Sequence, residues 1–195
     1  MEIGSDAHWI VRGRLLASRA PRGEPEVRAL AQEGVTHILS LVENRDEPDW
    51  VREAGVEYLQ SRMSEMGSPD PAEVGRALVQ VLGALAAAER NCVLVHCRAG
   101  VGRAGVVAAA YLGATAGLTP EEAIREVRER RPGALWSQDK EVAVEDFLRE
   151  FASGRLLLEG ERNCPRCETR ILSPQRLCFR CSGAKTLDSY LGVGS

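Results

Sequence analysis

The sequence predicts an α/β fold, in which a mainly parallel central sheet is flanked by helices, followed by a small separate module. Short runs of β-branched and apolar residues alternate with longer runs in which apolar residues recur at helical spacing. After Gly154 the chain has few core-forming residues and contains four of its six cysteines. We therefore expect one domain over residues 1–153 and a second, smaller unit over residues 154–195.

The first 60 residues are expected to supply strands and one helix. Residues 9–11 and 56–59 are short apolar runs. Residues 35–42 are β-branched and apolar almost throughout, as in a strand that is covered on both faces. Residues 24–32 carry apolar side chains at helical spacing and are followed by Gly34, a residue type favoured just after a helix ends.

The remainder of the larger domain is expected to be mostly helical. A helix should begin near residues 68–71, where a capping residue and prolines precede apolar residues at helical spacing. Residues 92–95 indicate a buried strand, and the helix that starts at Arg103 is apolar on nearly all sides, so we expect it to be central. Thr119 precedes a proline and two acids, which indicates a further helix, and a last amphipathic helix is expected over residues 137–151.

The composition excludes several classes of protein. Hydrophobic residues make up 44% of the chain and charged residues 27%, which is enough for a packed core and argues against disorder. The net charge of −3 argues against a dedicated nucleic-acid or anionic-membrane binder. No apolar run approaches the roughly 20 residues that span a bilayer, and the first residues do not resemble a signal peptide. We expect a cytoplasmic monomer that does not bind membranes.

Residues 93–105 carry the strongest functional signal, because a buried strand runs through a glycine-containing loop directly into a helix. Five residues separate Cys97 from Arg103, so the loop can curl with its backbone N–H groups pointing inward at a helix N-terminus. That arrangement binds phosphate, and Arg103 would close the ring with a planar, two-pronged grip. The residues expected to surround the anion are Arg98, Ala99, Gly100, Val101, Gly102 and Arg103.

The positive field of the loop favours the thiolate form of Cys97, which is then a nucleophile poised below a bound phosphate. His96 is expected to orient the loop by hydrogen bonding rather than to act as a base. Cys92 is expected to be a core residue, with a protective disulfide to Cys97 as its alternative role.

The pattern His-Cys-x-x-Gly-x-x-Arg over residues 96–103 resembles the signature of the protein tyrosine and dual-specificity phosphatase superfamily. Further similar features span about residues 8 to 151 and include Trp9-Ile10, the run 34–41 and Arg131-Pro132-Gly133. The resemblance is nearest to the small atypical dual-specificity type. The resemblance implies a phosphatase that acts on phosphotyrosine, phosphoserine or phosphothreonine in proteins and needs no cofactor for catalysis.

The leaving oxygen needs a proton, which a carboxylic acid on a loop normally supplies. In the family this acid is an aspartate four residues before the proline that begins the next helix. Pro69 matches that proline, so the resemblance points to Glu65. Asp70 is the alternative, although a carboxylate at a helix start also fits a stabilising role near the helix dipole. Gln138 either positions the hydrolytic water or is a solvated helix residue.

Ala104 departs from the family pattern, which has Ser or Thr directly after the loop arginine. The missing hydroxyl would stabilise the leaving thiolate, so hydrolysis of the phospho-enzyme is expected to be slow relative to its formation. Two other functions remain open at this point. One is a phosphate-binding scaffold without turnover, and the other is an RNA 5′-phosphatase.

The last part of the chain contains two CxxC pairs separated by ten residues, namely Cys164, Cys167, Cys178 and Cys181. Four thiolates at this spacing suit tetrahedral Zn²⁺ and leave no open position, so a structural zinc site is expected. Residues 161–195 contain six basic and three acidic residues, and six minus three is +3. Zinc with four thiolates lowers that to about +1, so nucleic-acid binding is not favoured. The module is expected to dock a partner or to pack like a lid on the larger domain.

Overall fold

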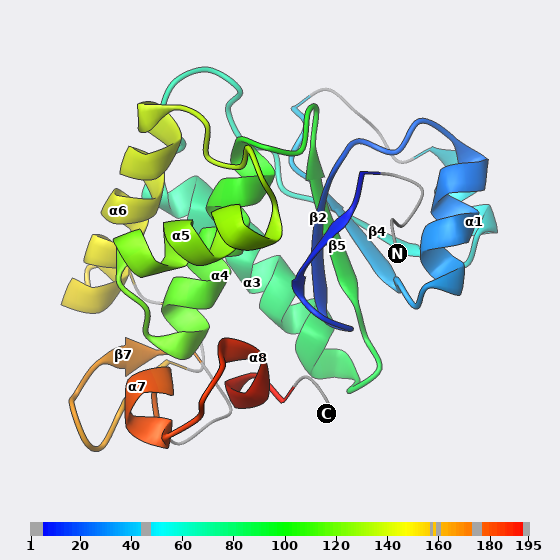
Figure 1. Cartoon of the computed structure of the whole chain (residues 1–195). Coiled ribbons are helices and arrows are strands. Elements are labelled where there is room, and N and C mark those ends of the chain that lie inside the picture. Colours follow the sequence, from blue (N-terminus) through cyan, green and yellow to red (C-terminus); the bar gives the residue numbers. More distant parts are fainter. Residues whose placement is uncertain (1–5, 44–47, 157, 159–160, 173–176, 193–195) are drawn as a thin grey trace.

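The computed structural model describes residues 6–43, 48–156, 158, 161–172 and 177–192. Within these residues the larger domain is built on a five-stranded sheet of order β1-β2-β5-β3-β4 (Figure 1). β1 pairs antiparallel with β2 at one edge, and the other neighbours pair in parallel. The predicted mainly parallel sheet is therefore confirmed. The strands are His8–Val11 (β1), Leu15–Arg19 (β2), His37–Ser40 (β3), Glu57–Gln60 (β4) and Val93–Cys97 (β5).

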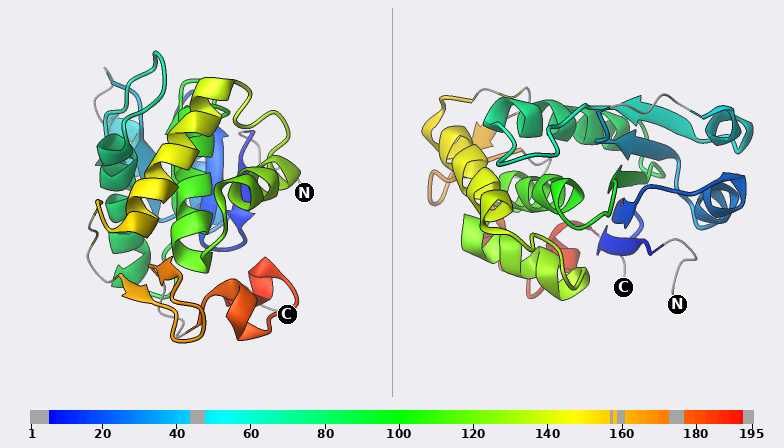
Figure 2. Two further views of the ribbon diagram at one scale, coloured as in Figure 1. Left: turned by 90° about the vertical axis from the view of Figure 1, so that its left-hand side faces the viewer. Right: turned by 90° about the horizontal axis from the view of Figure 1, so that it is seen from above.

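Helices cover both faces of this sheet. α1 and α2 lie on one face and α3 to α6 on the other, as the view from above in Figure 2 shows. Each face has its own apolar core, so a strand such as β5 is buried on both sides. The helices are Glu24–Gln32 (α1), Asp49–Glu53 (α2), Pro71–Ala87 (α3), Arg103–Ala116 (α4), Pro120–Arg130 (α5) and Gln138–Ser153 (α6).

Several helix boundaries follow from local capping chemistry. Asp70 caps α3 by accepting a hydrogen bond from the Ala72 N–H, and Glu73 completes a capping box. Thr119 caps α5 in the same way together with Glu122. Every residue of α4 is buried, which confirms the prediction that this helix is central.

Two described elements of the larger domain were not predicted from the sequence. β2 lies between β1 and β5, and its residues from Leu15 to Ala17 are buried together with the small polar Ser18. The strand has only five residues, of which Ser18 and Arg19 are polar, so it lacks the long apolar run that marks the other central strands. α2 is a single short helix of five residues, too short for helical periodicity to be visible.

The smaller unit packs against the end of α4 that lies opposite the Cys97 loop (Figure 1). The Leu172 N–H donates to the Ala114 carbonyl at 2.6 Å, and the Tyr190 hydroxyl donates to the Thr115 carbonyl at 3.2 Å. Of the two alternatives considered from the sequence, the structure shows packing of the smaller unit against the larger domain, at a place that does not cover the loop. Its elements are Arg162–Asn163 (β6), Arg170–Ile171 (β7), Phe179–Ser182 (α7) and Leu187–Tyr190 (α8).

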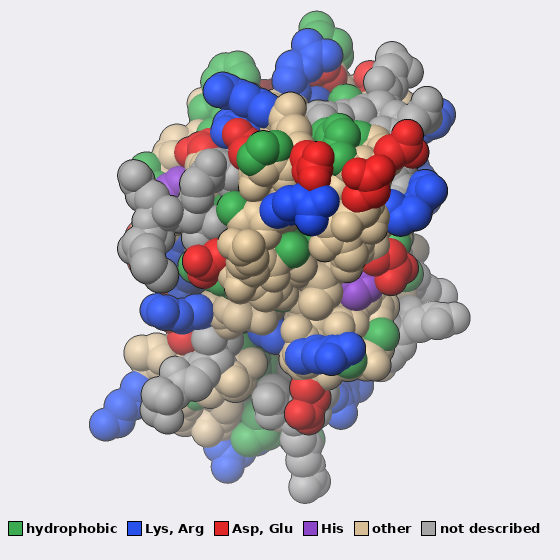
Figure 3. Space-filling model, turned by 90° about the vertical axis from the view of Figure 1, so that its right-hand side faces the viewer, with side chains coloured by type: hydrophobic (Ala, Val, Ile, Leu, Met, Phe, Trp, Pro, Cys, Tyr) green, Lys and Arg blue, Asp and Glu red, His purple; other side chains and the backbone are tan. Residues whose placement is uncertain are grey.

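Two surface properties agree with the composition. On the face that carries α1, acidic and basic side chains are interspersed, as expected from a net charge of −3 (Figure 3). No helix of the described residues is long and apolar enough to cross a membrane.

Candidate active site

The loop between β5 and α4 curls around Cys97, the last residue of the strand. The Gly100 N–H donates to the Cys97 sulfur at 3.2 Å, and Cys97 is only 3% exposed. Gly100 has φ +76°, and a Cβ on it would lie 2.2 Å from the backbone nitrogen of Arg19. Only glycine fits here, because the loop lies in direct contact with the backbone at the end of β2.

Arg103, the first residue of α4, is held beneath this loop. Its side chain is 4% exposed and donates to the carbonyls of Leu41 at 3.1 Å and Met63 at 2.9 Å. These carbonyls follow β3 and β4, so the guanidinium connects three neighbouring segments at the carboxyl edge of the sheet. A buried cation fixed at the start of a helix is suited to bind an anion there.

Glu65 lies in the connection between β4 and α3, and its carboxylate reaches both arginines of the loop. One oxygen lies 3.2 Å from the Arg98 guanidinium, and the other lies 3.8 Å from the Arg103 guanidinium. The side chain is 40% exposed, so it faces solvent and the loop together. The structure thus brings Glu65 to the loop that contains Cys97.

Asp70, the other acid considered from the sequence, is engaged differently. Its carboxylate accepts the Ala72 N–H at 2.8 Å, and its backbone N–H donates to Glu73 at 3.1 Å. These bonds use Asp70 as the cap of α3, which is the stabilising role considered from the sequence.

Arg131 supports the loop from behind, a role that sequence reasoning missed. It is 1% exposed, its Nε donates to the Gly100 carbonyl at 2.7 Å, and its other nitrogens donate to Asp6 at 2.8 Å. Burial tends to raise the pKa of Asp6, but the hydrogen bonds and charges of Arg131 and His8 together outweigh it and lower that pKa. The family resemblance included Arg131 and Pro132, but it gave no indication that Arg131 contacts the loop.

The start of α6 lies beside the loop. A Cβ on Gly102 would lie 3.5 Å from Lys140 Cε and 3.8 Å from the Trp136 indole nitrogen. Gln138, the first residue of α6, is exposed in this same segment. Lys140 is buried, and sequence reasoning did not single it out, because a lone lysine on an amphipathic helix gives no sign of burial.

His96 and Ala104, which flank the loop residues, are both buried. The His96 carbonyl accepts the Leu41 N–H at 2.9 Å, which fixes the end of β5 to the residue after β3. Ala104 lies in the first turn of α4.

A disulfide between Cys92 and Cys97 is wrong. The two residues stand at opposite ends of β5, so their Cα atoms lie about 16 Å apart at about 3.3 Å per residue. A disulfide needs a Cα separation below about 7 Å. The core role of Cys92 is confirmed, and burial raises the pKa of its thiol to about 12 although the charge of Arg14 acts in the opposite direction.

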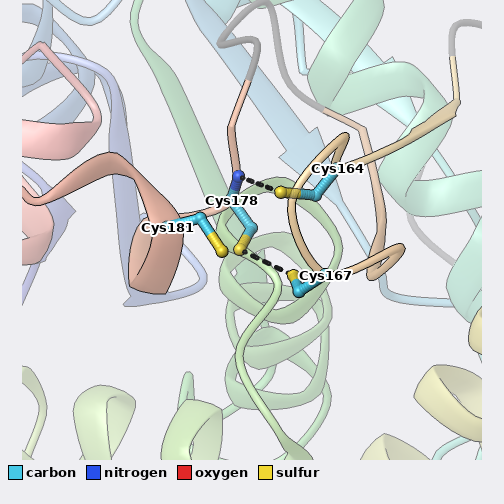
Figure 4. Close-up of side chains that lie close together, drawn as sticks. All are labelled: Cys164, Cys167, Cys178 and Cys181. Atoms are coloured by element: carbon cyan, nitrogen blue, oxygen red, sulfur yellow. Dashed lines mark hydrogen bonds between the residues drawn. The ribbon is translucent and has the colours of Figure 1, made fainter.

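The four cysteines of the smaller unit converge (Figure 4). Their sulfur atoms all lie within 4.8 Å of one another. Four sulfurs bound to one Zn²⁺ at about 2.3 Å would lie about 3.8 Å apart, so the cluster fits that ion. The Cys178 N–H donates to the Cys164 sulfur at 3.4 Å, and the Cys167 sulfur lies 3.2 Å from the Thr169 hydroxyl. Such bonds orient sulfur ligands in metal sites.

Comparison with known proteins places this geometry in a family context. A profile of the PTP-SAK family, described as the DSP-PTPase phosphatase domain of Swiss Army Knife proteins, matches residues 5–144. Protein tyrosine phosphatase domain-containing protein 1 of Mus musculus is 28% identical over 148 residues, or 74% of this chain and 17% of that protein. The dual specificity protein phosphatase Mpk3 of Drosophila melanogaster is 34% identical over 105 residues, or 53% of this chain and 25% of that protein. The chain therefore spans a small part of these curated relatives.

Solved structures agree with the sequence comparison. The active form of Tk-PTP superposes with a TM-score of 0.65 at 31% identity, covering 74% of this chain and 97% of that one. PTPMT1 superposes with a TM-score of 0.65 at 26% identity, covering 76% and 98%. The family match ends at residue 144, before the four-cysteine cluster.

Proposed function

This chain belongs to the PTP-SAK family of dual-specificity and tyrosine phosphatase domains, and from that membership we propose that it hydrolyses phosphomonoesters through a phospho-cysteine intermediate at Cys97. One observation carries the proposal. The loop that contains Cys97 and Arg103 has a carboxylate, Glu65, at 3.2 Å and 3.8 Å from its two arginines. The proposed nucleophile, anion-binding ring and proton donor therefore lie together at one edge of the sheet, which supports the proposal.

In the first step, the loop amides of residues 98–103 and the Arg103 guanidinium bind the phosphate oxygens. The Cys97 thiolate attacks phosphorus, so that a sulfur–phosphorus bond forms as the bond to the leaving oxygen breaks. Glu65 donates a proton to that oxygen, and the alcohol or phenol departs.

In the second step, water attacks phosphorus and gives its proton to the Glu65 carboxylate. The sulfur–phosphorus bond breaks, which regenerates the thiolate and releases inorganic phosphate. Gln138 is proposed to orient this water, since its segment lies beside the loop. No metal takes part in either step.

The proposed substrates are proteins that carry phosphotyrosine, phosphoserine or phosphothreonine. Support comes from the relatives, which are named as tyrosine and dual-specificity protein phosphatases. Cys97 is buried at the base of the loop, so the phosphate must enter the loop to reach it. A phosphorylated side chain on an exposed segment of a substrate protein can do this.

The test is rapid mixing with an aryl phosphate, in which release of the phenol is followed for wild type and Cys97→Ser. We expect a burst close to one equivalent of phenol in the wild type and none in the variant. If the wild type binds inorganic phosphate but releases no phenol, the site is a phosphate-binding scaffold and the proposed activity is refuted.

We further propose that Cys164, Cys167, Cys178 and Cys181 hold a structural Zn²⁺, in a unit that begins after Gly154. The convergence of the sulfurs supports this, because four thiolates around zinc leave no site for a substrate. Zinc binding requires reduced thiols, which favours a cytoplasmic location. When bound, the ion would hold together a segment that has a small apolar core of its own.

A further inference from the structure

Lys140 is an unusual cation in this chain. Only two of the 25 basic residues are lysines, and Lys140 is 5% exposed whereas Lys185 is exposed. Burying an ammonium group is costly unless its donors are satisfied. Lys140 donates to the Asp139 carboxylate at 2.9 Å and to the Gly67 carbonyl.

The side chain of Lys140 touches two segments of the candidate active site. Its aliphatic part packs on Gly102, where a Cβ would lie 3.5 Å from Cε and 3.9 Å from Cγ. Its ammonium group bonds to Gly67, two residues after Glu65. One residue of α6 therefore joins the phosphate loop to the connection that carries the proposed acid.

That connection is well anchored at its two ends. At the start, the Ser61 N–H donates to Ser40 at 3.0 Å, and Arg103 donates to the Met63 carbonyl at 2.9 Å. At the end, the capping box of α3 fixes Asp70.

The middle of the connection, residues 65–68, is exposed. Within the described part of the chain, the bond from Lys140 to Gly67 is the one that ties the backbone of these residues to another element. On the other side of Glu65, the Ser64 N–H donates to the Glu73 carboxylate of α3 at 3.2 Å. The position of the Glu65 carboxylate thus depends on these two flanking backbone attachments and on its own contacts with two arginines.

We propose that Lys140 is a positioning residue, which holds residues 65–68 so that the Glu65 carboxylate stays over the loop for proton transfer. This inference rests on the proposed role of Glu65. A general acid must approach the leaving oxygen to hydrogen-bond distance, and a displacement of about 1 Å can cost about 100-fold in rate. The ammonium group itself points to Gly67 and Asp139, so its effect on the reaction is indirect.

The test uses leaving groups that differ in their need for a proton. Phenolate needs protonation as it departs, because the pKa of a simple phenol is about 10. The anion released from 4-nitrophenyl phosphate is stable without a proton. The ratio of kcat/KM for the two substrates therefore reports how well the acid is placed, whatever the rate of phospho-enzyme hydrolysis.

Lys140→Met keeps the aliphatic side chain and removes the ammonium group. We expect kcat/KM to fall about 10-fold for phenyl phosphate and less than about 2-fold for 4-nitrophenyl phosphate. Glu65→Gln should show the same selectivity with a loss of about 100-fold. The matched control Lys185→Met, at the other lysine, should leave both values unchanged. Lys140→Gln retains a donor for Gly67 and should restore part of the wild-type ratio, and it serves as the test if the methionine variant does not fold.

An equal loss on both substrates, or weaker inhibition by inorganic phosphate, would show that Lys140 acts on phosphate binding and would overturn the inference. No loss on either substrate would also overturn it. If Glu65→Gln itself shows no selectivity, the proposed acid is wrong, which is a separate failure. If Glu65→Gln is selective and Lys140→Met is not, only the positioning role is wrong.

Discussion

Ala104, in the first turn of α4, has no hydroxyl with which to stabilise the thiolate that leaves when the phospho-enzyme is hydrolysed. The side chain is fully buried in the first turn of the helix, directly after Arg103. Hydrogen bonds to a developing anion can contribute about 2 to 3 kcal/mol.

We expect Ala104→Ser to raise steady-state turnover by about 10-fold and to reduce the amplitude of the phenol burst. Stopped-flow measurement of the two phases checks this. If the variant keeps the wild-type burst and turnover, slow hydrolysis has another cause. Ala114→Ser, a substitution in the same helix away from the loop, is the matched control for adding a hydroxyl to α4.

The bond between Arg131 and Asp6 makes loop support depend on pH. Because the folded-state pKa of Asp6 is lowered, its contribution to stability is present above the unfolded pKa near 3.9 and is lost as pH falls through the lower folded-state pKa. Asp6 is half exposed, so the contribution is below about 1 kcal/mol.

Asp6→Asn should therefore lower the melting temperature slightly at pH 7, and the difference should shrink as pH falls below the ordinary pKa of an aspartate and through the lowered pKa of Asp6. Thermal unfolding at several pH values tests this. No difference between the two proteins at any pH would mean that Asp6 supports the loop only through its backbone carbonyl, which the variant retains.

Cys97, Arg103 and Glu65 could be found in the sequence because the first two belong to a local motif and the third is tied to a proline by spacing. Arg131 and Lys140 could not. Arg131 meets Gly100 across 31 positions, and Lys140 meets Gly67 across 73 positions. Such contacts depend on how helices pack, and no local pattern encodes them.

At the level of elements, the four-cysteine cluster is the feature most open to experiment. Cys164 and Cys167 lie in the turn between β6 and β7, whereas Cys178 and Cys181 lie at the start of the short helix α7. β6 and β7 have only two residues each. Strands of this length are not stable by themselves, so we expect the metal to hold the unit.

We predict that the purified protein contains one zinc per chain and that removing it with a chelator lowers the melting temperature by roughly 5 °C or more. kcat/KM should remain within about 2-fold, because α4 separates the two sites by 14 residues, or about 21 Å. Metal analysis combined with calorimetry tests both statements. If kcat/KM falls in proportion to the zinc removed, the unit also shapes the active site.

Elements with a long uniform pattern were predicted, and so were the short strands β1 and β4, but β2 and α2 were missed. α1 has the bounds expected from its periodicity, whereas β2 went unrecognised because a strand of five residues with a polar end resembles a turn region. The burial of Ser18 follows from the fold and not from the local sequence, because Gly100 lies directly against the backbone of Ser18 and Arg19.

Across the whole molecule, the two units are connected by polar contacts as well as apolar packing. The Tyr190 hydroxyl donates to the Thr115 carbonyl, and Arg180 pairs with Glu122. The sequence predicted both units, but it held no information on which end of α4 the smaller one would occupy.

Because of these contacts, we expect a single unfolding transition for the holoprotein. Tyr190→Phe should lower the free energy of unfolding by about 1 to 2 kcal/mol. Tyr58→Phe is the matched control, because the Tyr58 hydroxyl has no hydrogen-bond partner among the described residues. Denaturant titration with both variants tests this, and two separate transitions would mean that the units unfold independently.

The position of β5 also affects how the chain folds. β2 and β3 make no direct hydrogen bonds in the sheet, and each pairs with β5, which comes after both in the chain. A nascent chain that ends before residue 93 therefore has neither a continuous sheet nor a nucleophile. Since pairings between distant segments form slowly, the catalytic centre and the sheet should be completed in one late folding event. Activity recovered during refolding should then appear in the same kinetic phase as the sheet itself.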